Sequence, residues 1–138
     1  MTGEFDLGAH TADVAVEATG DSLASVFEAT AAGLTAAHTG SVLPTGGEPF
    51  HLGVAAASRE ALLFDYLDEQ IYERDVRGVL PTDHAVDVHW NGEWVAEASA
   101  RGVPFDAVDA REIKAVTYSE MALEETGEGW RAYVVFDV

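Results

Sequence analysis

Residues 85–100 read AVDVHWNGEWVAEASA, and this stretch decides the fold class because it has the pattern of an antiparallel hairpin. Apolar and polar residues alternate over 85–90, as in a strand with one buried face, and β-type residues return over 93–100. Asn91-Gly92 between them is a strong signal for a tight type I′ turn, in which both central residues have positive φ. The stretch therefore predicts two antiparallel strands joined by a tight turn.

Outside this hairpin, short β-type segments alternate with two helical patterns. Strands are predicted at 5–7, 14–18 and 50–56, and 113–123 is predicted to pair with 130–136 across a turn at 124–129. Helical spacing of apolar residues follows an N-cap at Asp21 or Ser22, and a second helix runs from its cap at Ser58 to about Arg74. This order predicts an α+β, two-layer domain over residues 1–138, with a mainly antiparallel sheet and two helices on one face.

The composition is strongly acidic, with 25 acidic residues, 7 basic residues and a formal net charge of −18 in 138 residues. Self-repulsion on this scale is screened near 1 M salt, where the Debye length is about 3 Å, so we expect a salt-loving source. The basic residues form no cluster in the sequence, which argues against direct nucleic-acid binding. Acidic residues are also expected along the exposed side of the second helix, at Asp65, Asp68, Glu69 and Glu73.

Several classes of protein are disfavoured by what the sequence lacks. No apolar run approaches the roughly 20 residues that span a bilayer, and the N-terminus does not resemble a signal peptide, so a cytoplasmic protein without a membrane partner is expected. The absence of cysteine excludes thiolate metal sites and cysteine nucleophiles. Phosphate-binding loops and hydrolase motifs are missing, so no catalytic or cofactor-binding residue is predicted. Four dispersed histidines are interpreted as incidental: His38, His51, His84 and His89.

Two segments have residues suited to binding a cation. In His10-Thr11-Ala12-Asp13 a carboxylate stands where a turn leads into a strand, although Asp13 in such a place often only caps the turn. The last strand ends at Asp137-Val138, which offers a side-chain carboxylate and the α-carboxylate, although a terminal aspartate often lies free in solvent. If the segments are neighbours, three oxygen donors meet, and Ca²⁺ accepts such ligands at about 2.3–2.6 Å.

Lys114 is the only lysine of the chain and lies in the segment Glu112-Ile113-Lys114-Ala115-Val116-Thr117-Tyr118. A lysine among arginines is consistent with a function that needs a compact ammonium group with three donors. It is equally consistent with a strand-edge residue that discourages pairing with another chain.

The three segments just described resemble the archease family, whose motifs match HTADV at 10–14, EIKAVTY at 112–118 and VFDV at 135–138. Residues 20–23 and 62–72 are similar to the helical segments of the family, so the resemblance runs from end to end. The chain departs from the family at Ala9, where an acidic residue is common, and at Ser119, where archaeal members often have histidine. Neither departure touches the expected ligands, and either would alter the surface that meets a partner.

The resemblance implies a non-enzymatic accessory protein that activates the GTP-dependent tRNA-splicing ligase by promoting its guanylylation and multiple turnover. It implies a divalent cation, Ca²⁺ or alternatively Mn²⁺ or Mg²⁺, bound by Asp13, Asp137 and Val138, with His10 and Lys114 in partner contact or activation. One alternative is a chaperone of RNA-modifying enzymes such as methyltransferases, docking through the acidic second helix. Another is a small metal-dependent hydrolase with His10 as base.

Overall fold

The computed structural model describes residues 3–9, 13–39, 44–105 and 110–138, which form two helices and seven strands. The predicted α+β class and the antiparallel pairing of the strands are confirmed. Neither of the two helices is long and apolar enough to cross a membrane. The elements are, in order, β1 (Gly3–Ala9), β2 (Asp13–Gly20), α1 (Leu23–Thr39), β3 (Glu48–Ala56), α2 (Arg59–Arg77), β4 (Val79–Trp90), β5 (Trp94–Pro104), β6 (Ala115–Thr126) and β7 (Gly129–Asp137).

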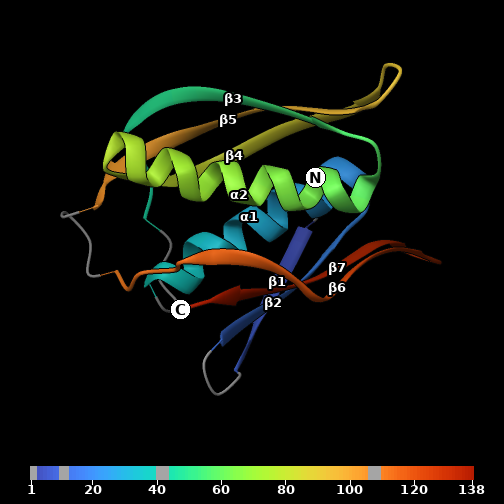
Figure 1. Ribbon diagram of the computed structural model, residues 1–138, viewed down its shortest axis with the longest axis horizontal. Helices are drawn as coiled ribbons and strands as arrows, with labels where there is room; N and C mark the ends of the chain where they lie inside the picture. Colours follow the sequence, from blue (N-terminus) through green and yellow to red (C-terminus); the bar gives the residue numbers. More distant parts are fainter. Residues whose placement is uncertain (1–2, 10–12, 40–43, 106–109) are drawn as a thin grey trace.

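The strands divide into two sheets, a four-stranded sheet in the order β1-β2-β7-β6 and a three-stranded sheet in the order β3-β5-β4. Both helices contact strands of both sheets, and Figure 1 shows the helices lying between them. The sequence pattern predicts the strands but not this division. Alternating hydrophobicity identifies a strand with one buried face, and it carries no information about which strands on either side of a helix are neighbours.

One hydrophobic core fills the space between the helices and the inner faces of the two sheets. The rings of Phe27 on α1 and Tyr66 on α2 stack in it with their centroids 5.7 Å apart. Gly33 on α1 lies so close to β2 that a Cβ atom there would collide with the side chain of Val16. A glycine at this position therefore lets α1 approach the four-stranded sheet.

Both helices begin where the sequence predicts. The Ser22 hydroxyl accepts a hydrogen bond from the amide of Ser25 at 3.0 Å, and the Ser58 hydroxyl accepts one from the amide of Ala61 at 3.1 Å. The second helix continues past the predicted end, to Arg77, because Gly78 adopts φ 65° and its amide bonds the carbonyl of Arg74. A left-handed glycine of this kind is a common way to end a helix.

The hairpin within residues 85–100 is present, but the predicted type I′ turn is wrong. The last pair of the β4–β5 ladder is Trp90 with Trp94, which leaves three connecting residues, and the amide of Asn91 donates to the carbonyl of Glu93 at 2.8 Å. Of these residues only Gly92 has a positive φ, 77°. Strand β4 also begins earlier than predicted, at Val79, with an irregular register between Thr82 and Ala85.

The second predicted hairpin, in contrast, has a tighter turn than the sequence suggests. Thr126 pairs with Gly129, so the turn between β6 and β7 consists of residues 127–128 rather than 124–129. Gly129 adopts φ 145°, and a side chain there would collide with the carbonyl of Gly20. Acidic residues that look like a loop in sequence therefore extend the strands.

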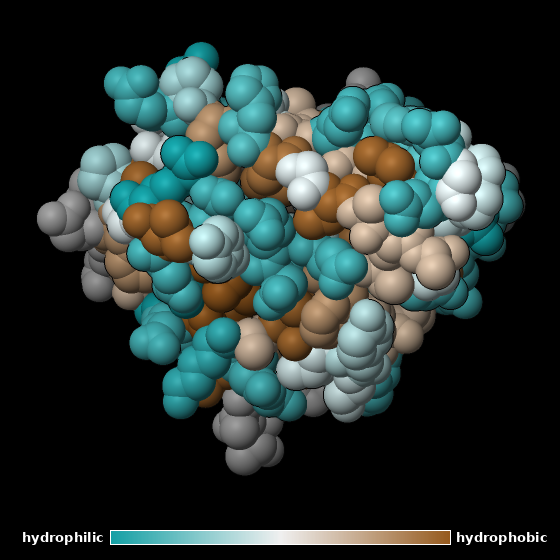
Figure 2. All heavy atoms as spheres, turned by 45° about the horizontal axis from the view of Figure 1, so that its top comes forward, coloured by the Kyte–Doolittle hydropathy of each residue, from teal (hydrophilic) through white to brown (hydrophobic). Residues whose placement is uncertain are grey.

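The acidic side of α2 is less exposed than predicted, because the helix lies between two sheets. Glu73 is only 8% exposed and forms an ion pair with Arg77, so its assignment to the exposed face is wrong. Asp68 is exposed as predicted, whereas Asp65 and Glu69 are half-buried. Over the molecular face shown in Figure 2, hydrophilic and hydrophobic side chains are interspersed.

We expect the replacement Glu69→Gln to stabilise the protein above pH 7 at low salt. Burial, the hydrogen bond and charge of Glu73, and the charge of Asp68 raise the pKa of Glu69 from 4.5 to about 7. The folded state therefore holds a proton that the unfolded state releases, and stability falls as the pH rises from 4.5 through 7. Thermal melts at pH 8 should show a Tm a few degrees above wild type, and melts at pH 5 should show little gain.

Because the repulsion is screened by salt, the gain at pH 8 should shrink at 1 M KCl. Glu60→Gln is the matched control, since Glu60 lies in the first turn of α2, where a negative charge favours the helix. A gain for Glu69→Gln that is equal at pH 5 and pH 8 would contradict the assigned proton.

Candidate functional site

Asp13 and Asp137, one from each of the two segments predicted to bind a cation, lie side by side at one end of the four-stranded sheet. Asp13, the first residue of β2, pairs directly with Asp137, the last residue of β7. On its other side Asp137 pairs with Ala115 of β6, and its carbonyl accepts a hydrogen bond from the amide of Lys114 at 2.8 Å. The predicted proximity of Asp13 and Asp137 is confirmed, while cation binding between them stays a prediction.

The two aspartates present their side chains on the same side of the sheet, because residues directly opposite in an antiparallel pair share a face. Asp13 is half-buried and Asp137 is exposed. Among the described residues neither carboxylate forms an ion pair with an arginine, lysine or histidine. Like charges directly opposite in a sheet destabilise it, so this pair favours a bound cation.

The nearest arginine along this face is committed to other carboxylates. Arg131 of β7 lies 2.6 Å from Glu17 and 2.8 Å from Glu124, at the part of the sheet away from Asp137. These contacts raise the pKa of the Arg131 guanidinium, chiefly through the hydrogen bond to Glu17, so it stays charged. The negative charge of the two aspartates is therefore left without a side-chain counter-ion in the described structure.

Of the other predicted site residues, Val138 directly follows Asp137 and is 38% exposed, so its backbone oxygens are at the same end of the sheet. His10 lies outside the described residues. The structure thus joins Asp13, Asp137, Val138 and the backbone of Lys114 in one place.

The segment before β6, which carries Lys114, is held from below by the two helices. Arg74 of α2 donates from Nη1 to the carbonyl of Ile113 at 2.6 Å. Arg111 donates from Nε to the carbonyl of Ala37 at 2.8 Å, and its amide bonds the carbonyl of His38 at 2.7 Å, at the end of α1. These bonds fix the backbone just before Lys114, and the amide of Lys114 itself is bonded to the carbonyl of Asp137.

His38 completes this anchor in a defined protonation state. Its Nε2 lies 3.1 Å from Arg74 Nη1, and since arginine only donates, Nε2 accepts and Nδ1 donates to the carbonyl of Leu34 at 2.9 Å. Burial lowers the pKa of His38 to about 4, with the charges of Arg74 and Arg111 acting in the same direction. The interpretation of His38 as incidental is wrong, because the neutral ring orients Arg74.

Arg74 is a positioning residue that the sequence interpretation missed. It is 7% exposed although it carries a charge. A signal was present, since Arg74 lies three residues after Ile71 and seven after Leu67, on the apolar stripe of α2. A charged residue at a stripe position is often read as the end of the stripe, and only the packing shows that it is buried.

The motif at 112–118 also contacts α2 through an aromatic pair at its C-terminal end, within β6. Tyr118 stacks on Phe64 with ring centroids 4.0 Å apart and an angle of 3° between the planes. Lys114 itself borders a hollow of about 410 Å³ with Arg74, Asp75, Gly78, Phe105 and Glu112. This hollow beside Lys114 contains both signs of charge and has room for a side chain of a partner.

Comparison with known sequences gives one family. The family described as "Archease protein family (MTH1598/TM1083)" matches residues 5–138. The chain is 31% identical over 134 residues to Protein archease of Methanosarcina barkeri, covering 94% of this chain and 92% of that protein. It is 30% identical over 134 residues to Protein archease of Pyrococcus furiosus, covering 94% of each.

Solved structures lead to the same family. The fold matches the solution structure of Protein 1598 of Methanobacterium thermoautotrophicum with a TM-score of 0.84 and 26% identity, covering 97% of this chain and 98% of that one. It matches the crystal structure of an archease, described as a possible chaperone, of Thermotoga maritima with a TM-score of 0.64 and 26% identity, covering 94% and 93%.

The description of the Thermotoga maritima archease as a possible chaperone agrees, at the level of the family, with the prediction of an accessory protein. The resemblance inferred from the motifs at 10–14, 112–118 and 135–138 is confirmed as well, and the match extends over both helices and both sheets. The chain belongs to the archease family.

Proposed function

We propose that this protein activates the GTP-dependent tRNA-splicing ligase by promoting guanylylation of the ligase and its repeated turnover, using a divalent cation held at the end of the four-stranded sheet. The observation that carries the proposal is the direct pairing of Asp13 with Asp137, two carboxylates that come from opposite ends of the chain. Membership of the archease family supports the assignment to RNA processing.

The cation would be held by the side chains of Asp13 and Asp137 and by the carboxylate of Val138. Oxygen donors of this kind suit a hard cation such as Ca²⁺, with Mn²⁺ or Mg²⁺ as alternatives. A divalent ion would also remove the repulsion between two carboxylates that have no side-chain counter-ion.

The surface around the aspartates suits a protein partner that carries its own nucleotide and metal. The exposed carboxylate of Asp137 would meet the metal centre of the ligase, and Lys114, held by Arg74 through Ile113, would contact anionic groups beside it. The tRNA would be bound by the ligase, because the seven basic residues of this chain form no cluster in the sequence. His10, three residues before Asp13 in the sequence, would add to the partner contact.

The test is a guanylylation assay with purified ligase and GTP, in high salt, with and without this protein at substoichiometric amounts. We expect each molecule of the protein to promote guanylylation of several ligase molecules and to raise the amount of exon joined per ligase. Guanylylation that is unchanged by the protein at any ratio would reject the proposal.

A second candidate, a chaperone for RNA-modifying enzymes, is favoured by one observation: the archease of Thermotoga maritima is described as a possible chaperone. Pull-down of the tagged protein separates the two functions. Recovery of the ligase in stoichiometric amount supports the activator, whereas recovery of several modification enzymes without the ligase supports the chaperone.

A further inference from the structure

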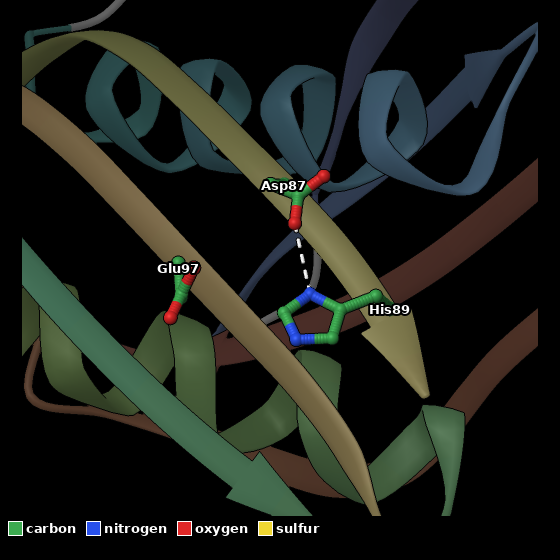
Figure 3. Close-up of side chains that lie close together, drawn as sticks. All are labelled: Asp87, His89 and Glu97. Carbon is green, nitrogen blue, oxygen red and sulfur yellow. Dashed lines mark hydrogen bonds and ion pairs between the residues drawn. The ribbon is translucent and has the colours of Figure 1, made fainter. Parts of the chain in front are cut away.

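A second group of metal-ligating side chains lies on the three-stranded sheet, away from the aspartate pair. Asp87 and His89 come from β4 and Glu97 from β5, and one ligand atom of each lies within 4.8 Å of the others. Figure 3 shows Asp87 and His89 on one strand, with Glu97 on the neighbouring strand. These three residues are the one group of three or more such ligands among the described residues.

The strand register brings these side chains together. Asp87 pairs directly with Glu97, and His89 follows Asp87 by two residues, so all three lie on one face of the β4–β5 ladder. The register is continuous from Ala85 to Trp90, beyond the irregularity at Thr82. A regular antiparallel ladder holds its side chains in place better than a loop does, which suits a ligand set.

The hydrogen bond between His89 Nδ1 and Asp87 Oδ2, 2.8 Å long, keeps the ring beside the carboxylate. Glu97 has no ion-pair partner among the described residues, although it stands directly opposite Asp87. Two carboxylates so placed repel each other, and only one histidine is at hand to offset them. The arrangement has an excess of negative charge that a cation would neutralise.

The site is also open to an ion and its waters. On the other side of Glu97 the paired residue is Gly53 of β3, and a Cβ atom there would meet nothing closer than the Ala96 carbonyl at 3.7 Å. Asp87 and Glu97 are exposed and His89 is 39% exposed. An ion would therefore keep solvent ligands in addition to three from the protein.

We propose that Asp87, His89 and Glu97 form a second metal site that binds a first-row transition ion such as Zn²⁺, Co²⁺ or Ni²⁺. The imidazole decides the class of ion, because histidine suits these metals, whereas Ca²⁺ and Mg²⁺ prefer oxygen ligands alone. This choice distinguishes the site from the aspartate pair at Asp13 and Asp137, which offers only oxygen. The two sites lie on different sheets.

The test is titration of the full chain with Co²⁺ and with Ni²⁺ by calorimetry, in buffered KCl containing excess Ca²⁺ to fill oxygen-only sites. We expect one saturable site that His89→Asn weakens at least about 10-fold, and that Asp87→Asn and Glu97→Gln each weaken to a similar extent. Glu48→Gln is the control for loss of one negative charge, since Glu48 is exposed on β3 and pairs with Gly102, away from the three ligands, and it should leave the affinity within about 2-fold of wild type.

A second measurement needs no variant. Substoichiometric Co²⁺ should broaden and shift the imidazole NMR signals of His89 before those of His38, which lies at the end of α1 against Phe105. Equal affinity in wild type and His89→Asn, an equal loss in Glu48→Gln, or displacement of Co²⁺ by Ca²⁺ would each overturn the proposal.

Discussion

Replacing Asp13 with asparagine is expected to abolish most of the stimulation of ligase guanylylation. Asp13 is one of only two side-chain carboxylates in the proposed cation site, and it pairs directly with the other, Asp137. Loss of one ligand from so small a set should lower the affinity for the cation at least about 10-fold. Guanylylation of the ligase, measured at a fixed substoichiometric amount of the variant and limiting Ca²⁺, should fall close to the level without activator.

Stability supplies an independent measurement for the same variant. Without added metal, Asp13→Asn should be equal to wild type or up to about 1 kcal/mol more stable, because the repulsion across the strand pair is removed. With Ca²⁺ the wild type should gain stability according to the occupancy of the site, and the variant should gain much less. This contrast separates loss of the cation from misfolding.

Glu128→Gln is the control for the change in charge. Glu128 is exposed in the turn between β6 and β7, at the opposite end of the sheet, so this variant should stimulate the ligase like wild type. Full stimulation by Asp13→Asn would show that the aspartate pair has no part in activation.

The second large effect is expected from Arg74→Met, which removes the buried guanidinium group that donates to the carbonyl of Ile113, next to Lys114. The carbonyl of Ile113 and the Nε2 of His38 would both lose their donor, and each unsatisfied buried acceptor costs about 1–3 kcal/mol. We expect a loss of about 2–4 kcal/mol in the free energy of unfolding and a Tm lower by roughly 10 °C, measured by denaturant titration and thermal melts.

Arg74→Met should also increase local opening of the backbone at Lys114 while the protein stays folded. The amide of Lys114, which donates to the carbonyl of Asp137, should exchange hydrogen faster in Arg74→Met, while amides in the β2–β7 ladder stay protected. Arg101→Met is the comparison, because Arg101 is exposed and donates a hydrogen bond to the carbonyl of Gly47 at 3.0 Å. Its replacement should lower the free energy of unfolding by only about 0.5 kcal/mol. If the amide of Lys114 exchanged hydrogen at the wild-type rate in Arg74→Met, Arg74 would have no part in positioning the site.

Local patterns determined much of the fold. The caps at Ser22 and Ser58 set where the helices begin, since a hydroxyl there satisfies an amide that the helix leaves unpaired. The turns were less predictable. Asn91-Gly92 carries the signal of a two-residue turn, but the ladder ends at Trp90 and Trp94, and the packing of these two indole rings, 5.5 Å apart, accompanies that register.

The burial of charged residues was the least predictable feature. Glu73 and Arg74 look like the exposed end of a helix, yet both are buried because α2 is covered by two sheets. His38 and His89, dispersed among other residues in sequence, each take part in a definite arrangement once strands and helices bring distant residues together. Spacing along one element reports only the partners of that element, so contacts between elements leave no local signal.

The sequence by itself determined the family, the α+β class, the starts of both helices and the residues suited to holding a cation, because these follow from motifs and from the period of each element. Only the tertiary structure decided that the strands form two sheets with the helices between them, that Asp13 stands opposite Asp137, and that Asp87, His89 and Glu97 meet. The physical reason is that strand register joins residues far apart in the chain, and register is fixed by the packing of the whole core.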